Sequence, residues 1–285
     1  MINILVTGGN GQLATCIKDI ESNYSNLNII YTDSDTLDIT DFKAVQNFFN
    51  NKTIHYCINC AAYTAVDKAE TEQQIAKEIN TLGPSNLARV CKDNNTTLIQ
   101  ISTDFVFKGD KSVAYTEADT TIPTGIYALT KLEGEQEIVK YLKQHFIIRT
   151  SWLYSENGNN FMKTMIKLSH DRNELNVVAD QIGTPTYATD LAETILKIIT
   201  TNHHEYGIYH YSNEGVASWY DFAKAIFEEA HINIKVLPIK TKEYPTPAKR
   251  PHFSVLDKSK IKTSLNIEIP YWRDSLKKAL SNYNG

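Results

Sequence analysis

The chain begins with Ile2-Asn3-Ile4-Leu5-Val6-Thr7 and runs directly into Gly8-Gly9-Asn10-Gly11-Gln12-Leu13-Ala14. The first run is a short apolar strand, and a glycine-rich turn that follows a strand and opens a helix is the arrangement a dinucleotide fold requires. Gly8 permits the tight turn, and Gly11 lacks the Cβ that would block a pyrophosphate. From Gln12 and Leu13 onward, the free N–H groups of the helix would face the anion. The alternative interpretation is an ordinary strand–helix turn, which often carries glycine.

The composition narrows the class of protein. With 285 residues the chain is long enough for one large α/β domain, or for one large and one small domain. A net charge of −4 argues against a general nucleic-acid binder. No run of about 18 apolar residues occurs, so we expect no membrane-spanning segment. The first strand leaves no room for a signal peptide, and four cysteines suggest no disulfide framework, so we expect a cytoplasmic protein.

Strands and helices alternate through the first half of the chain. Strand-like runs occupy residues 2–7, 28–33, 55–61, 97–103 and 146–151, and helical patterns occupy residues 12–21, 41–51, 74–93 and 127–142. Near-continuous apolar strands between amphipathic helices predict an α/β fold, a doubly wound Rossmann-like parallel sheet covered on both faces. Ligands bind beyond the carboxyl ends of such strands. The residues that follow the strands are Gly8–Gly11, Asp33, Ala61, Ala62, Tyr63, Thr64, Thr103 and Trp152.

The pattern loosens after residue 151. Helices are predicted at residues 160–170, 189–201, 218–231 and 272–283, and short strands at 176–179, 207–212 and 234–239. We therefore predict a dinucleotide-binding domain over residues 1–151. Residues 152–285 are predicted to form mainly a smaller C-terminal substrate-binding lobe, with some chain crossing back to the first domain.

Asp33 ends the second strand, about 20 residues beyond the glycine turn. An acid there can accept hydrogen bonds from a ribose 2′-hydroxyl and repel a 2′-phosphate, which favours NADH over NADPH. Lys43 or Lys68 could still reach a phosphate, and Asp33 could instead be a simple turn residue. Asp38 and Ile39 could line the adenine, although Asp38 could equally cap the helix that begins near Thr40.

Tyr127 and Lys131 lie four residues apart in a predicted helix, and therefore on one face of it. A neighbouring cation favours the phenolate, so we expect Lys131 to lower the pKa of Tyr127 and suit it to proton transfer. Thr103, at the end of the fourth strand, can hydrogen-bond the same substrate oxygen. With a dinucleotide turn, these residues predict hydride transfer to or from a carbonyl carbon, without a metal. The alternative is a surface pair of helix residues.

The combination resembles the extended short-chain dehydrogenase/reductases, and longer runs narrow the resemblance to the dTDP-4-dehydrorhamnose reductase family. These runs are residues 8–13, 59–70 (Asn-Cys-Ala-Ala-Tyr-Thr-Ala-Val-Asp-Lys-Ala-Glu), 102–107 (Ser-Thr-Asp-Phe-Val-Phe), 149–154, 159–161 and 180–186, with Arg250-Pro251 and Ser254. The resemblance covers residues 2 to about 280. It implies reduction of the C4 keto group of dTDP-4-dehydro-L-rhamnose, giving dTDP-L-rhamnose, by an NAD(P)H-dependent oxidoreductase.

The resemblance also implies roles for individual residues. Tyr127 is the expected proton donor, with Lys131 beside it and Thr103 tuning the pair. Thr103, Asp104 and Trp152 match positions that hold the sugar, and Lys131 is expected to hold nicotinamide ribose hydroxyls as well. The matching cofactor contacts are Gly11, Gln12, Leu13, Asp38, Ile39, Ala62, Tyr63 and Thr64.

The chemistry of two further side chains indicates possible contacts with the substrate. Trp152 is expected to stack on the sugar or the nicotinamide, although an indole in such a run is often core. Arg250 could pair with the substrate diphosphate, because an arginine fork suits phosphate oxygens; a solvated basic loop is the alternative.

The sequence departs from the family pattern at two places that bear on the site. Phe105 replaces the usual tyrosine after Thr-Asp, which removes a hydroxyl and leaves the exact sugar open; Ala14 replaces a glycine. Some members of the family dimerise through Mg²⁺ bound by glutamates, one of them near the C-terminus. Residues 271–285 contain no glutamate, so Glu193 would lack a partner. Mg²⁺ therefore stays possible without support from the C-terminus, and a monomer or a homodimer is expected.

Two rival functions stay open on the sequence alone. Another nucleotide-sugar short-chain enzyme, an epimerase or a dehydratase, shares the tyrosine and lysine and often adds an acid beside Thr103, where Asp104 stands. A non-catalytic regulatory subunit of the same fold is the second rival, and the intact Thr103, Tyr127 and Lys131 argue against it.

Overall fold

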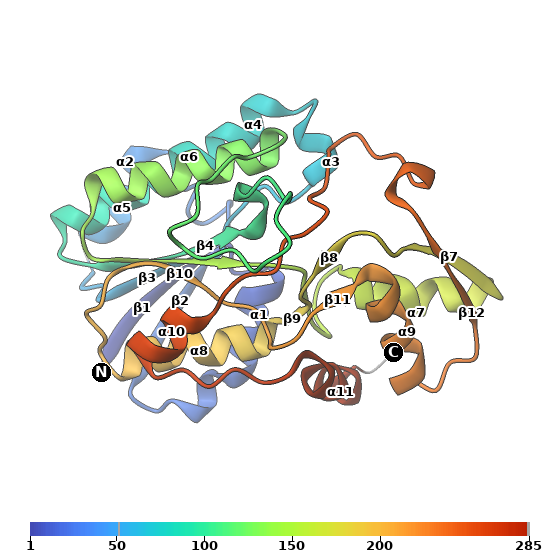
Figure 1. Ribbon diagram of the computed structural model, residues 1–285. Coiled ribbons are helices and arrows are strands. Elements are labelled where there is room, and N and C mark those ends of the chain that lie inside the picture. Colours follow the sequence, from blue (N-terminus) through green and yellow to red (C-terminus); the bar gives the residue numbers. More distant parts are fainter. Residues whose placement is uncertain (51, 284–285) are drawn as a thin grey trace.

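The structure is a computed structural model that describes residues 1–50 and 52–283, and its centre is a parallel sheet (Figure 1). The strand order is β10-β5-β4-β3-β1-β2. These strands are β1 (Ile2–Thr7), β2 (Leu27–Thr32), β3 (Tyr56–Asn59), β4 (Thr97–Thr103), β5 (His145–Thr150) and β10 (Gly207–His210). The doubly wound α/β fold is confirmed, and β1 to β5 each lie within two residues of their predicted bounds.

Helices cover both faces of the sheet because successive strand residues point to opposite sides. Ile4 and Val6 of β1 pack in one cluster with α1 (Gln12–Ile20) and α8 (Ala188–Thr200). Leu5 belongs to the opposite cluster, with α2 (Phe42–Asn50), α5 (Gly83–Asp93) and α6 (Ile126–Tyr141). Both α8 and the edge strand β10 come from the second half of the chain, so that half helps to build the main sheet and its layers (Figure 1).

The order of the strands changes direction beside β1. β2 lies on one side of β1, whereas β3, β4 and β5 follow on the other, and ligands bind at such a switch point. Gly8 has a left-handed backbone (φ +67°), and a Cβ there would lie 2.6 Å from the Ala61 nitrogen. Only glycine therefore allows the turn after β1 to touch the segment after β3.

The helix predicted at residues 74–93 is not one α-helix. It consists of α4 (Gln73–Lys77), a wider π-helical turn (Glu78–Leu82) and α5. Pro84 has no N–H to bond the Asn80 carbonyl, and the Asn80 side chain instead accepts from the Tyr63 nitrogen (2.9 Å) and donates to the Tyr63 oxygen (3.1 Å). A Cβ on Gly134 of α6 would lie 2.2 Å from the Asn80 oxygen. The interruption therefore fixes the segment after β3 against α6.

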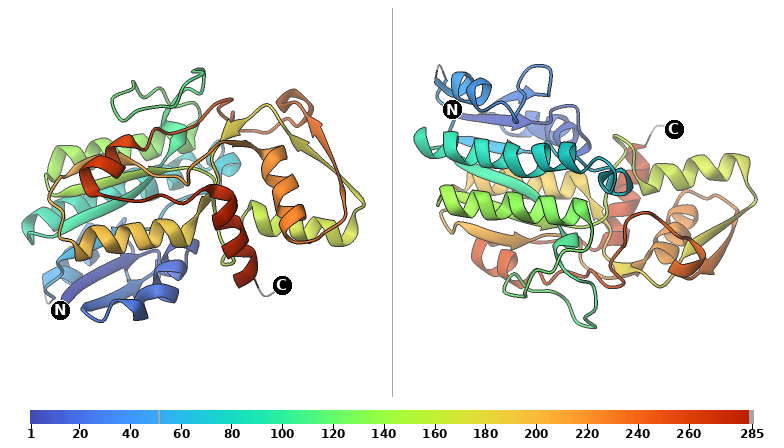
Figure 2. Two further views of the ribbon diagram at one scale, coloured as in Figure 1. Left: turned by 60° about the horizontal axis from the view of Figure 1, so that its bottom comes forward. Right: turned by 90° about the horizontal axis from the view of Figure 1, so that it is seen from above.

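A second hydrophobic core lies in the lobe formed by the C-terminal half, at one end of the sheet (Figure 2). It contains the parallel pair β7 (Glu174–Val178) and β12 (Lys235–Ile239), with α7 (Phe161–Asp171), α9 (Trp219–Glu229) and α11 (Trp272–Asn282). α9 begins with a capping box, because the side chain of Ser218 accepts from the Asp221 nitrogen and the Asp221 carboxylate accepts in return.

The remaining elements are short, and the sequence did not predict them. They are α3 (Val66–Ala69), α10 (Ser259–Leu265), the strand pairs β6 (Leu153–Tyr154) with β9 (Thr186–Tyr187) and β8 (Ile182–Gly183) with β11 (Ala217–Ser218), and 3₁₀ turns at Glu21–Asn23, Asp104–Val106 and Thr241–Glu243. The predicted helix at residues 41–51 is described as α2 up to Asn50, and its last predicted residue, 51, lies outside the described residues.

Candidate active site

A crevice opens at the switch point of the sheet. Gly11 precedes α1 in an extended conformation (φ −77°, ψ 161°) and no side chain caps that helix, so its first N–H groups stay available for an anion. The adjoining cavity has a volume of about 560 Å³. Seven of the predicted cofactor residues line it: Gly8, Gly11, Asp33, Asp38, Ile39, Ala61 and Ala62. Gln12, Leu13, Tyr63 and Thr64 adjoin these in the chain but are not among the lining residues that the structure describes.

Asp33 is held at the wall of this crevice by several donors. Its carboxylate accepts from the Asn10 amide (2.6 Å) and from the Thr36 hydroxyl (3.1 Å) and nitrogen (3.2 Å). The hydrogen bond from the Thr36 side chain is the largest of the causes that lower the pKa of Asp33. Asp35, Asp38 and Glu78 lie in the same wall, so the crevice is acidic around the expected position of the ribose.

The structure separates the two interpretations of Asp38. The cap of α2 is Asp41, whose carboxylate accepts from the nitrogens of Lys43 (2.9 Å) and Ala44 (3.1 Å). Asp38 instead accepts from the nitrogen and the hydroxyl of Thr40 and lines the cavity. Asp38 is therefore not the helix cap.

The last three residues of β4 face three residues of α6. The Ile101 carbonyl accepts from Lys131 Nζ (2.7 Å), Ser102 Oγ donates to Glu135 (2.5 Å), and Thr103 lies in polar contact with Tyr127. α6 is anchored at its start by Glu70, whose carboxylate accepts from the Ile126 nitrogen at 2.9 Å. The structure thus brings the three predicted catalytic side chains together at the end of one strand.

Burial governs the pKa values of Tyr127 and Lys131. It raises the pKa of Tyr127 to about 12, while the contact with Thr103 lowers it and the charge of Asp104 raises it further. This direction is opposite to our expectation, because desolvation of the phenol outweighs any help from Lys131. Burial lowers the pKa of Lys131 to about 8, and the nearby Glu135 carboxylate opposes that shift.

Asp104 is a buried carboxyl with one free oxygen. Its Oδ1 accepts from Thr103 Oγ1 (3.1 Å), whereas Oδ2 has no hydrogen-bond partner among the described residues. Burial raises the pKa of Asp104 to about 6, although the nearby Ser254 hydroxyl acts in the opposite direction. An unpaired buried oxygen beside Thr103 and Tyr127 is available to a ligand.

An ion pair lies behind Lys131. Arg149 donates to both oxygens of Glu135, with its Nη2 2.6 Å from Oε2, and both side chains are almost completely buried. Together with Ser102, this pair fixes the middle of α6 against β4 and β5.

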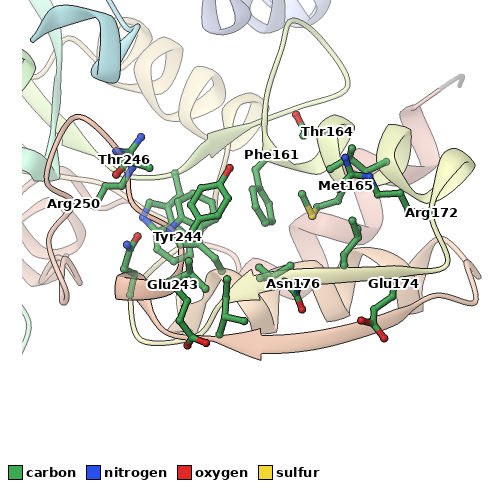
Figure 3. A pocket seen from close by; sticks show the side chains of 18 of the residues that line it. Phe161, Thr164, Met165, Arg172, Glu174, Asn176, Glu243, Tyr244, Thr246 and Arg250 are labelled. Carbon is green, nitrogen blue, oxygen red and sulfur yellow. The ribbon is translucent and has the colours of Figure 1, made fainter.

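The lobe holds a second cavity of about 620 Å³ (Figure 3). Phe105 lines it, and its ring also meets the ring of Tyr127 edge-on at 5.8 Å, so the cavity adjoins the end of β4. Phe161 and Met165 of α7 point toward the cavity in Figure 3. The other residues that line it include Trp152, Arg172, Glu174, Gln181, Trp219, Tyr244 and Arg250.

Trp152 lines this cavity, but one face of its ring is already covered. The rings of Trp152 and Trp219 stack 3.6 Å apart, at an angle of 9°. Trp152 has a left-handed backbone (φ 47°), and Gly183 makes room for its ring, since a Cβ there would lie 2.7 Å from Cε2. Stacking of a sugar on Trp152 stays a prediction for the part of the ring that Trp219 leaves uncovered.

Arg250 reaches the same cavity and is paired within the protein. Its guanidinium donates to both carboxylate oxygens of Asp67, each at 2.8 Å, and to the Ala248 carbonyl. A substrate phosphate would share this arginine with Asp67 or displace the carboxylate.

Sequence reasoning missed several residues that build these sites. Trp219 and Phe161 lie in predicted helices where aromatic residues normally indicate core. Phe161 also belongs to the family-like run 159–161, whereas only its place at the start of α9 could have marked Trp219. Asn10 and Ser254 gave no signal beyond their presence in family-like runs. Asn80 lies in the middle of a predicted helix, and the following Gly83-Pro84 was the available sign of a break there.

The structure also shows the surroundings of two cysteines and of Glu193. Cys57 and Cys60 are free thiols: Cys57 belongs to one hydrophobic cluster of the sheet, and Cys60, just after β3, packs against the other. Glu193 is an exposed residue of α8, and desolvation of its carboxylate by the surrounding protein raises its pKa. Within residues 1–50 and 52–283, no group of three or more side chains is arranged to hold a metal ion, and no helix is long and apolar enough to cross a membrane.

A protein family, curated relatives and solved structures match this chain over nearly its whole length. The model of the RmlD substrate binding domain family matches residues 2–284. The chain is 40% identical over 288 residues to the dTDP-4-dehydrorhamnose reductase of Aggregatibacter actinomycetemcomitans, covering 97% of this chain and 98% of that protein. The crystal structure of a dTDP-4-dehydrorhamnose reductase from Clostridium acetobutylicum superimposes with a TM-score of 0.95 at 44% identity, covering 98% and 99% of the two chains. A Bacillus anthracis dTDP-4-dehydrorhamnose reductase, solved in complex with NADP, superimposes with a TM-score of 0.94 at 41% identity, covering 99% of each chain.

Proposed function

The chain belongs to the RmlD substrate binding domain family, and from that premise we propose that it is a dTDP-4-dehydrorhamnose reductase. It reduces the C4 keto group of dTDP-4-dehydro-L-rhamnose to dTDP-L-rhamnose with NADH or NADPH. The observation that carries the proposal is the meeting of Thr103, Tyr127 and Lys131 at the end of β4, in a chain similar to such reductases over its whole length. The same likeness favours this reaction over an epimerase, a dehydratase or a regulatory subunit.

The glycine turn fits a dinucleotide cofactor. A Cβ on Gly8 would lie 2.6 Å from the Ala61 nitrogen, and a Cβ on Gly11 would lie 3.1 Å from the Gly8 oxygen, so the turn has no room for side chains. The uncapped start of α1 suits a pyrophosphate. The crevice is bordered by Gln12, Leu13 and the segment from Ala61 to Thr64. When bound, the reduced nicotinamide supplies the hydride.

Tyr127 donates the proton to the substrate oxygen. With a pKa of about 12 the phenol carries its proton at neutral pH, as a donor must. Thr103 hydrogen-bonds the same oxygen, which orients it toward the phenol. Lys131, held by the Ile101 carbonyl, keeps a positive charge near the phenolate that remains and binds ribose hydroxyls.

The nucleotide sugar lies between the two halves of the site. Asp104, with its free Oδ2, and Trp152 hold the sugar beside Thr103, and Arg250 binds the diphosphate in the lobe cavity. In this arrangement residues 1–151 mainly bind the dinucleotide and residues 152–285 mainly bind the substrate, although β10 and α8 return to the main sheet.

The direct test mixes the purified protein with enzymatically made dTDP-4-dehydro-L-rhamnose and either NADH or NADPH. We expect loss of the reduced-nicotinamide absorbance, with one cofactor oxidised for each ketosugar reduced. Release of water from dTDP-glucose in a parallel assay, with no net cofactor consumption, would identify a dehydratase instead. Absence of turnover of the ketosugar with both cofactors would contradict the proposal.

Replacing Tyr127 with Phe removes the proton donor and keeps the ring against Phe105. We expect turnover to fall by roughly 10²–10⁴, the usual range for acid–base catalysis, while NADH affinity stays near that of the wild type. Tyr141→Phe, the same change at the far end of α6, is the matched control and should leave turnover intact. Equal turnover in Tyr127→Phe and the wild type would remove Tyr127 from the reaction.

We propose in addition that NADH is the preferred cofactor of this chain. The ionised Asp33 and its acidic neighbours in the crevice disfavour a 2′-phosphate. Asp33→Ala should raise the affinity for NADPH relative to NADH, measured by the fluorescence of the bound cofactors. Asp35→Ala removes the same charge from the same wall without the Asn10 contact, and it should change the ratio less. An unchanged ratio in Asp33→Ala would exclude the 2′-hydroxyl contact.

A further inference from the structure

Asn160 lies at the point where the lobe meets the glycine turn. It is the N-cap of α7, where its Oδ1 accepts from the Lys163 nitrogen at 3.2 Å. Its Nδ2 donates to Gln12 Oε1 at 2.8 Å, and also to the carbonyls of Ser155 and Asn157. One amide therefore joins the start of a helix in the lobe to Gln12, the first residue of α1.

The loop before Asn160 is shaped to make this contact. Gly158 has a left-handed backbone (φ +66°), and a Cβ there would lie 3.2 Å from the Cβ of Gln12. The loop thus packs directly against the side chain that follows Gly11. Packing and the Asn160 hydrogen bond therefore both connect this loop to the start of α1.

The residue after Asn160 is part of the lobe cavity. Phe161 points into it in Figure 3, with its ring centroid 4.7 Å from that of Trp219. Trp219 in turn stacks on Trp152. The contacts from Gln12 through Asn160 to these three aromatic rings are continuous, and they join the dinucleotide crevice to the cavity proposed for the nucleotide sugar.

We propose that Asn160 is a positioning residue that couples the two binding sites. This coupling rests on the proposed function, because it requires the cofactor at the glycine turn and the nucleotide sugar in the lobe. A cofactor that fixes the start of α1 also fixes the start of α7 through Asn160, so the aromatic rings are ordered before the second ligand arrives. The coupling is reciprocal: each ligand raises the affinity of the protein for the other.

A second hydrogen bond between the same segments provides a matched control. Asn157 Nδ2 donates to Asp19 Oδ2 at 2.8 Å, joining the same loop to α1, but at the far end of that helix from the glycine turn. Asp19 is exposed, and Asp19→Ala removes this bond while leaving the contact at Gln12 in place.

The experiment measures the dissociation constant of dTDP with and without saturating NADH, so that no turnover occurs. In the wild type and in Asp19→Ala, NADH should tighten dTDP binding by about fivefold, the effect expected of one ordinary hydrogen bond. Asn160→Ser keeps a good helix cap but cannot reach Gln12, and the factor should fall close to one. Gln12→Ala removes the same bond from the other side, and the double variant should lose no more coupling than either single one.

The outcomes separate this inference from the proposed function. A protein that binds neither NADH nor dTDP contradicts the function itself. A wild type that binds both independently, or an Asn160→Ser variant whose coupling equals that of the wild type, overturns the role of Asn160 and leaves the reductase proposal standing. A loss of coupling as large in Asp19→Ala as in Asn160→Ser would also overturn it, since any contact between loop and helix would then suffice.

Discussion

The end of β4 and the lobe cavity hold their side chains in different ways. At the end of β4, Lys131 is bonded to a backbone carbonyl, and Glu135 is bound by Arg149 and Ser102 in a nearly dry environment. In the lobe, Trp152 and Trp219 are held by stacking and by the space that Gly183 leaves. The first region consists of buried polar groups with specific partners, and the second of aromatic surfaces.

The difference corresponds to two demands on such an enzyme. A buried polar group is costly unless its partner is in place, so each bond at the end of β4 restricts the catalytic groups to one arrangement. Aromatic packing is less directional and accommodates ligands that differ in shape. We therefore expect substitutions at the end of β4 to cost folding free energy or turnover, and substitutions in the lobe to change mainly the affinity for the nucleotide sugar.

The largest effect on stability is expected from Glu135→Gln. The change leaves Arg149 buried without its counter-charge, which typically costs about 3–5 kcal/mol. Urea denaturation of the wild type and the variant measures this difference in the free energy of unfolding.

The exposed ion pair of Lys235 and Glu174 in the lobe provides the control. Glu174→Gln removes the same charge at the surface, where such pairs contribute about 0–1 kcal/mol. Equal losses in the two variants would show that burial does not distinguish the two regions, and the comparison would fail.

Asp104→Asn should increase stability at the expense of activity. The pKa of about 6 for Asp104 lies above the usual value near 3.9, so ionisation of this carboxyl costs folding free energy once the pH rises through this range. The cost is absent below about pH 4 and complete above about pH 6. The variant should exceed the wild type by up to about 3 kcal/mol at pH 8, and by almost nothing at pH 4. A stability difference that does not change with pH would contradict the raised pKa of the buried Asp104 carboxyl.

Much of the fold could be predicted because its signals are local. The strands of the first half are apolar runs of six or seven residues between amphipathic helices, and the glycines of the first turn fix where the crevice opens. Gly83-Pro84 indicates a break in the helix predicted at residues 74–93, but the π-helical turn at Asn80 depends on Tyr63 and on Gly134 of a distant helix, which no local signal shows. α10 was missed because a helix as short as Ser259–Leu265 is stabilised by packing on the main core rather than by its own periodicity.

Only those features of the site that follow from strand ends and from helix spacing could be predicted. The meeting of Thr103, Tyr127 and Lys131 follows from a strand end and a helix face. The direction of the Tyr127 pKa shift does not, because it depends on how deeply the phenol is buried, which only the packing around Phe105 and Asp104 decides. The stacking of Trp152 on Trp219 joins segments 67 residues apart, and no spacing rule indicates it.

The smallest effect is expected in the lobe, from Trp219→Leu. Loss of the stack should remove about 0.5–1.5 kcal/mol of interaction that holds the Trp152 ring in place. The KM for the nucleotide sugar should therefore rise about two- to tenfold. NADH affinity and kcat should change little, because the end of β4 is untouched. Phe227→Leu, in the core on the same helix α9, is the control: it should lower stability without raising KM. If Trp219→Leu lowered kcat as strongly as Tyr127→Phe while KM stayed constant, the lobe would be part of the catalytic machinery, and the division of tasks between the two regions would be wrong.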